Sequence, residues 1–294
     1  MKHLLNLLAA VALLVWGTQL VRTGILRVFG ASLRQIIARS VRTPVTAALS
    51  GVGVTAVVQS STATALIVSS FVGQGLIALP AALAVMLGAD VGSSVMAVVF
   101  SLDLSWLSPL CIFVGVVLYV PRPDTTVGRM GRVFIGLGLM LLALRLITEA
   151  TTVLTQSDTV RALLGALASD LAMELTMGAL LALVSYSSLA TVLLTATLVG
   201  SGGIPVTVAL GLVLGANLGS GLLAVLTTLR ANVATRQVPL GNLMFKITGV
   251  ALMAPLAAPW LQYMRPYVAS DATLVVLFHL AFTCTMAVVC IGMA

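Results

Sequence analysis

The chain has 294 residues, of which 60% are hydrophobic and only 8% are charged. A soluble domain carries about 25% charged residues, so this composition excludes a soluble globular protein. The formal net charge is +7, but the arginines stand between apolar runs, as in loops that set membrane topology, and not in a patch for nucleic acid. The runs are too long and continuous for alternating β-strands. We therefore predict an all-α polytopic membrane protein.

The first expected element is a span over Leu4–Leu20. We interpret it as a membrane span and not as a signal peptide, because it has no small-x-small cleavage site. Residues Arg22–Arg42 mix arginines with apolar residues and predict a separate basic helix on the bilayer surface. Pro44–Leu79 is too long for one crossing of about 20 residues. The polar interruption Gln59-Ser60-Ser61-Thr62 within it predicts a re-entrant hairpin.

A second hairpin is expected over Leu175–Gly202, broken at Ser185-Tyr186-Ser187-Ser188, after a more polar connection over Thr155–Glu174. Full spans are expected at 80–100, 104–120, 133–153, 204–229, 240–263 and 272–294. Together these elements predict a single transmembrane domain over 1–294. Because the sequence stops inside an apolar run, we also expect a truncation after residue 294.

The chain contains an internal repeat. When the sequence is shifted by 127 positions, 59–94 aligns with 186–221 without a gap, and 16 of the 36 pairs are identical. Ser60 matches Ser187, and Gly88 matches Gly215. Repeat 1 is placed at about 44–100 and repeat 2 at about 171–229. Paired repeats with a substrate between them are typical of secondary transporters.

The arginines predict the orientation. The segments 22–42, 121–132 and 230–237 hold ten of the fifteen Lys and Arg residues, so we place them in the cytoplasm and the N-terminus outside. Hairpin one then enters from the cytoplasm and hairpin two from outside, which makes the repeats inverted. The opposite side carries acidic residues, namely Asp103, Asp158, Asp170 and Asp271.

In each repeat a Ser-Ser pair precedes a half-helix. Serine is a good N-cap, and the first amides of a helix have no internal partner, so a helix start attracts anions. Two such starts near the bilayer midplane predict an anion site. The residues expected there are Ser60, Ser61, Thr62, Thr64, Ser187, Ser188 and Thr191. The alternative is that these hydroxyls only hold membrane helices together.

The second repeated element is Gly88-Ala89-Asp90-Val91-Gly92-Ser93, which returns as Gly215-Ala216-Asn217-Leu218-Gly219-Ser220. Its glycines permit either an unwound helix or a close backbone contact. Unwound carbonyls with side-chain oxygens suit Na⁺. A carboxylate inside a span is costly, so Asp90 is expected to bind Na⁺ or carry a proton. The alternative is that Asp90 pairs with a buried Arg or Lys.

Two basic residues lie nearest the apolar interior. Lys246 can reach the cytoplasmic interface by snorkelling, and Arg145 can reach the outer interface or pair with Glu149 one turn away. We favour these structural roles over the alternative that either residue helps to bind an anion. The sequence has no nucleotide P-loop, no catalytic triad and no metal-ligand cluster, and its three cysteines show no metal-ligand spacing. We therefore do not expect an enzyme or an organic cofactor.

Gln59-Ser60-Ser61-Thr62, repeated as Tyr186-Ser187-Ser188-Leu189, resembles the paired Gln-Ser-Ser motif of the type II Na⁺/phosphate cotransporter family. The Gly-Ala-Asp/Asn-x-Gly-Ser elements resemble that family's second motif, and the likeness covers nearly the whole chain. It implies a transporter that couples inorganic phosphate to Na⁺ in a bacterial inner membrane. Bacterial members often carry a PhoU-like cytoplasmic domain, and the sequence leaves open a homodimer.

The resemblance adds Gln59 to the phosphate-binding candidates. The candidate Na⁺ ligands are Gln59, Asp90, Ser93, Asn217 and Ser220. Tyr186 departs from the family's second Gln, and Leu189 replaces a hydroxyl. The alternatives to Na⁺-driven phosphate uptake are a phosphate exporter, a transporter of another oxyanion such as arsenate, and a membrane phosphate sensor that does not transport.

Overall fold

The computed structural model describes residues 2–40, 42–102, 104–154 and 170–293, and the regular elements of that part of the chain are all helices. The predicted all-α membrane architecture is confirmed by six helices long and apolar enough to cross a bilayer. They lie at Leu4–Arg39, Leu79–Ser101, Thr126–Thr152, Val206–Thr228, Val233–Met264 and Asp271–Met293. Asp103, Asp158 and most of the expected polar connection lie outside the described residues.

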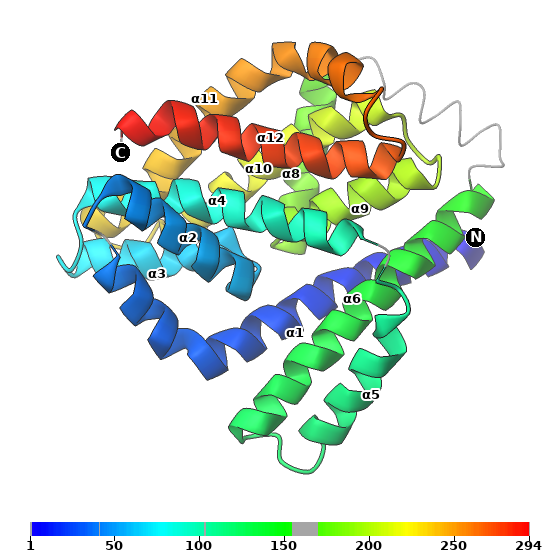
Figure 1. Cartoon of the computed structure of the whole chain (residues 1–294), viewed down its shortest axis with the longest axis horizontal. Coiled ribbons are helices and arrows are strands. Elements are labelled where there is room, and N and C mark those ends of the chain that lie inside the picture. The colour runs from blue at the N-terminus through cyan, green and yellow to red at the C-terminus, as the bar shows by residue number, and fades with distance from the viewer. Residues whose placement is uncertain (1, 41, 103, 155–169, 294) are drawn as a thin grey trace.

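The N-terminal region differs from expectation. The expected span and the expected surface helix form one helix, α1 (Lys2–Arg39), which bends part-way along so that its second half runs towards the start of α2 (Figure 1). No proline interrupts it, and Val21 and Ile25 are buried on either side of Arg22. Because apolar packing continues through the arginines, the helix does not stop at the expected boundary.

Each hairpin consists of two short helices. The first is α2 (Pro44–Val58) and α3 (Ser61–Gly73), followed by the full-length α4 (Leu79–Ser101). The second is α8 (Leu171–Ser185) and α9 (Ser188–Gly200), followed by α10 (Val206–Thr228). The corresponding helices have equal lengths of 15, 13 and 23 residues. The repeat is therefore structural, and its inverted arrangement stays a prediction.

Glycines set the packing inside each repeat. A methyl group added at Gly88 of α4 would collide with the carbonyl oxygen of Ala48 in α2. The equivalent group at Gly215 of α10 would collide with the carbonyl oxygen of Leu175 in α8. Because α4 and α10 are helical along their whole lengths, the glycines serve close backbone contact. The unwound turn that we considered does not form.

The remaining helices support the repeats. α6 (Thr126–Leu154) packs against both α1 and α5 (Leu107–Tyr119), and α11 (Val233–Met264) and α12 (Asp271–Cys290) pack against each other and against α4 and α10 (Figure 1). A short 3₁₀ turn, η1 (Ile291–Met293), ends the described chain. The expected spans at 104–120 and 240–263 have other bounds in the structure.

The helix α5 is shorter than a span. Its 13 residues extend for about 20 Å, whereas the hydrocarbon core is about 30 Å thick. The local sequence limits the length of α5, because a turn at residues 105–106 precedes the helix and Pro121 follows soon after it. The helix α11, in contrast, begins earlier than expected, at an Asn232 cap that accepts a hydrogen bond from the Thr235 amide.

The glycine contacts generate a prediction. We expect Gly88→Ala or Gly215→Ala to lower the free energy of unfolding by about 1–3 kcal/mol, because the added methyl forces two backbones apart. Gly53→Ala in α2 is the matched control, since a methyl group there meets nothing within 4 Å. Thermal unfolding of the purified variants in detergent measures the effect. Equal melting temperatures for Gly88→Ala and Gly53→Ala would contradict this account of the packing.

Candidate functional site: the cavity between the hairpin tips

The two hairpin tips meet at a small cavity, named here the tip cavity. Its volume is about 10 Å³, which holds roughly one water molecule. The lining comes from both repeats and consists of Gln59, Ser60, Ser61, Thr62, Ser93, Ser187, Ser188 and Leu189. Six of the eight predicted phosphate-binding residues are in this set. An anion as large as phosphate can enter only if the tips move apart.

The same local geometry reverses the chain in both hairpins. α2 ends at Gln59 with φ 58°, and α8 ends at Tyr186 with φ 53°. This left-handed conformation is uncommon for residues other than glycine and turns the chain sharply. The next serine caps the following helix in each case: Ser60 Oγ accepts a hydrogen bond from the Ala63 amide at 3.2 Å, and Ser187 Oγ accepts one from the Ala190 amide at 3.1 Å.

This geometry produces a site rich in hydrogen-bond donors. The first amides of α3 and α9 have no acceptor within their own helices, and each helix start carries about half a positive charge. A capping serine that accepts an N–H bond still has its own hydroxyl proton to donate. No carboxylate lines the tip cavity in the described part of the chain. The arrangement therefore suits a small oxyanion.

Two predicted binding residues lie elsewhere. Thr64 and Thr191 do not line the tip cavity but bind within their own hairpins. Thr64 Oγ1 lies 2.8 Å from Thr55 Oγ1, and Thr191 Oγ1 lies 3.2 Å from Ser185 Oγ. Their hydroxyls thus join the two half-helices of each hairpin, which is the packing role that we weighed as the alternative.

The two tips differ at their first residue. Gln59 is buried, and its Oε1 atom has no hydrogen-bond partner among the described residues. Tyr186, at the equivalent position, is 54% exposed. An unpartnered buried oxygen has a desolvation cost that a cation or a donor would offset. Only repeat 1 therefore directs a glutamine at the cavity, as the sequence departure suggested.

One cationic residue at the tips, Arg22, lies outside the predicted motifs. Arg22 of α1 lines a second small cavity together with Ser60 and Ser187, so α1 closes the third side of the tips. The described ion pairs are Arg145–Glu149, Asp90–Lys246 and Arg265–Asp271, and none of them uses Arg22. A half-buried guanidinium without a carboxylate partner there adds positive potential beside the two helix starts.

A basic cleft leads to this position. It lies between α1 and α3, has a volume of about 540 Å³, and is lined by Arg22, Arg34, Leu66 and Ile67 among other residues. Arg22 borders both the basic cleft and the small cavity at the tips. Arg22 and Arg34, two of the arginines that we assigned to topology, thus also line a cleft whose wall at Arg22 borders the tips.

Four of the five candidate Na⁺ ligands lie at two places. The fifth, Asn217, is buried and donates a hydrogen bond from Nδ2 to the Val213 carbonyl oxygen of its own helix at 2.8 Å. Gln59 and Ser93 line the tip cavity. Asp90 instead forms an ion pair with Lys246 of α11, with 2.9 Å between Oδ1 and Nζ, and the same Nζ donates a hydrogen bond to Ser220 Oγ at 2.8 Å. Lys246 is only 1% exposed, so the expected snorkelling is wrong. The alternative that we considered for Asp90, pairing with a buried cation, is what the structure shows.

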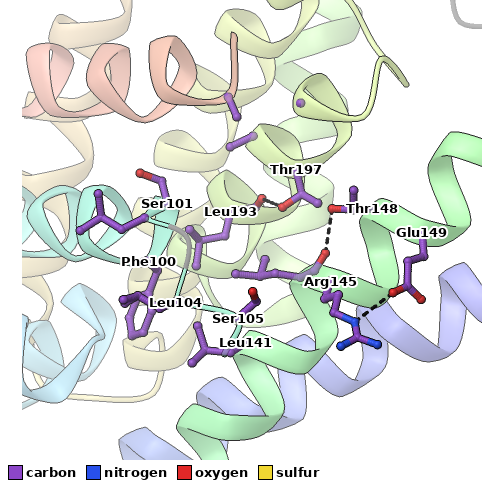
Figure 2. Close-up of a pocket in the computed structure, with 15 residues that line it drawn as sticks. Phe100, Ser101, Leu104, Ser105, Leu141, Arg145, Thr148, Glu149, Leu193 and Thr197 are labelled. Carbon is purple, nitrogen blue, oxygen red and sulfur yellow. Dashed lines mark hydrogen bonds and ion pairs between the residues drawn. The ribbon is translucent and has the colours of Figure 1, made fainter. Parts of the chain in front are cut away.

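A further cavity of about 380 Å³ lies away from the tips, between the ends of α4 and α9 and the middle of α6 (Figure 2). Figure 2 shows Arg145 turned towards Glu149, with Nε 2.9 Å from Oε1. Both side chains of this pair are exposed, so the predicted pairing is confirmed as a surface contact. Leu193 and Thr197 connect this cavity to the helix that begins at Ser188.

The sequence profile of the Na⁺/Pi-cotransporter family matches the chain twice, over residues 13–149 and 150–288. Each match contains one of the two hairpins. No solved structure gives a significant match.

The similar proteins are bacterial. A Salmonella typhimurium protein named "Putative inorganic phosphate export protein YjbB" is 52% identical over 282 residues, which is 96% of this chain and 52% of the relative. The protein of that name from Escherichia coli K12 is 51% identical over the same lengths. The protein YqeW of Bacillus subtilis is 23% identical over 258 residues, which is 87% of this chain and 83% of that protein. The chain thus spans about half the length of the YjbB relatives.

The tip geometry predicts different roles for adjacent serines. We expect Ser60→Ala to lower the free energy of unfolding by about 1 kcal/mol, because it removes an N-cap. Ser61→Ala, which removes a cavity-lining hydroxyl but not the cap, should change it by only a few tenths of a kcal/mol. Both substitutions should reduce the rise in melting temperature that added phosphate produces. Thermal unfolding with and without phosphate separates the two effects. An unaltered phosphate response in both variants would rule out the tip cavity as the anion site.

Proposed function

Because the chain belongs to the Na⁺/Pi-cotransporter family, we propose that it moves inorganic phosphate across the bacterial inner membrane, with the anion held between the two hairpin tips. The observation that carries this proposal is the tip cavity itself, to which both repeats contribute helix starts and serine hydroxyls. A non-transporting sensor would have no need of two matched half-sites.

The charge around the tips supports an anionic substrate. Arg22 stands beside the capping serines, and Arg34 lies further along the basic cleft. A cleft of one charge sign concentrates ligands of the opposite sign. Phosphate would approach through this cleft, which we place on the cytoplasmic side, and bind once the tips separate. The narrowness of the tip cavity agrees with a site that opens alternately to the two sides.

We propose Na⁺ as the coupling ion, on the basis of the family. Of the predicted Na⁺ ligands, Gln59 and Ser93 are the two that line the tip cavity, and the unpartnered Gln59 Oε1 is the best candidate ligand. We propose export as the direction in the cell, since the name of the YjbB relatives describes phosphate export. On the basis of the family resemblance we also propose a cytoplasmic, PhoU-like partner region.

The first test is phosphate flux in proteoliposomes that contain the purified chain. Radiolabelled phosphate should move when a Na⁺ gradient is imposed and not when K⁺ replaces Na⁺. Ser60→Ala/Ser61→Ala and Ser187→Ala/Ser188→Ala should each reduce the flux at least tenfold, because each removes one wall of the site. Flux that survives both changes in well-folded protein would disprove the paired site.

The role of Arg22 can be measured in the same assay. We expect Arg22→Gln to raise the KM for phosphate roughly tenfold or more, because a hydrogen bond to a charged group is worth about 1.5–3 kcal/mol. Arg27→Gln is the matched control, since Arg27 lies on the same helix, is exposed, and lines neither the basic cleft nor the small cavity. Equal KM values for the two variants would exclude a specific role for Arg22.

A further inference from the structure

A buried lysine stands where the sequence predicted a sodium ion. Lys246 Nζ contacts Asp90 of repeat 1 and Ser220 of repeat 2, and both of these positions belong to the repeated glycine motif. Asp90 is equivalent to Asn217, and Ser220 is equivalent to Ser93. The ammonium group therefore bridges the two repeats at equivalent elements, but the residue that carries it lies on α11, outside both.

The pair is closed off from solvent. Both side chains are 1% exposed. The second carboxylate oxygen of Asp90 has no hydrogen-bond partner among the described residues, and neither have the ring nitrogens of buried His279 on α12 or the Oδ1 atom of Asn242, one turn from Lys246. In such surroundings a charge is stable only when it is paired. The carboxylate and the ammonium therefore hold each other in place.

This arrangement leaves no place for Na⁺ at Asp90. A carboxylate and a hydroxyl oxygen are hard ligands of the kind that Na⁺ takes, but one positive charge already occupies them. A second cation in the same buried volume would leave a net positive charge without a counter-ion at low effective dielectric. The Lys246 side chain lies inside the helix bundle along its whole length, with 1% of its surface exposed.

We propose that the Lys246 ammonium is a built-in cation that fills this position permanently, so that Asp90 and Ser220 bind no Na⁺ and the coupling ion acts only at the tips. Lys246 would thus determine the ion requirement of the protein. The part of this inference that concerns transport rests on the proposed phosphate movement. The part that concerns ion binding is independent of it.

The test compares the wild type with Lys246→Met and with Asp90→Asn/Lys246→Met. Melting temperatures are measured in NaCl and in KCl at equal ionic strength, without phosphate. Lys246→Met leaves the buried carboxylate unpaired, so it should melt roughly 10 °C lower in KCl and recover a large part of that loss in NaCl. The double variant has no charge at the position and should show the same difference between Na⁺ and K⁺ as the wild type.

The double variant also keeps the test decisive if Lys246→Met fails to fold. Its phosphate flux should depend on Na⁺ as the wild-type flux does. If the wild type responds to Na⁺ in melting or in flux and the double variant does not, then Asp90 binds Na⁺ and the proposal is overturned. A folded Lys246→Met variant without extra Na⁺ stabilisation would also overturn it, because the position would then not accept a cation. Absence of flux in the wild type would refute only the proposed function, since the melting comparison does not involve phosphate.

Discussion

The structure depends on one constraint: the chain reverses direction twice in the middle of an apolar bundle. Backbone polar groups at such depth must be covered by protein or by water. A left-handed residue followed by a capping serine makes each reversal in a single step, at Gln59-Ser60 and again at Tyr186-Ser187. Placing the two reversals together concentrates unpaired amides at one point. The polar groups that are costly to bury in each hairpin are the ones that we propose bind the anion between the two hairpins.

The charged side chains of the bundle leave a positive potential where the two hairpin tips meet. Arg22 lies beside the capping serines and has no partner among the described ion pairs. Asp90, the only carboxylate in α4 and α10, is paired with Lys246 and does not line the tip cavity. An acidic group that would otherwise oppose an anion is therefore balanced within the bundle. The donors at the tips act without competition from it.

The sequence predicted the repeat, the two chain reversals and most of the residues at the tips, because these follow from local patterns: a polar interruption, a serine cap and a fixed offset of 127. It did not predict the roles of Arg22 and Lys246. Both lie outside the motifs, and each reaches a motif only through packing between helices that are distant in the chain. The prediction of two separate elements within α1 was wrong because apolar packing against other helices continues past the arginines, where the sequence suggested a boundary.

The contacts at Gly88 and Gly215 have a mechanical consequence. They bring the backbone of each first half-helix directly against the long helix of its own repeat, with no side chains between them that could change rotamer as the helices slide. Each repeat is therefore stiff, and relative displacement must be taken up between the repeats. Because the serine caps of both repeats line the tip cavity, such a displacement would widen or narrow that cavity.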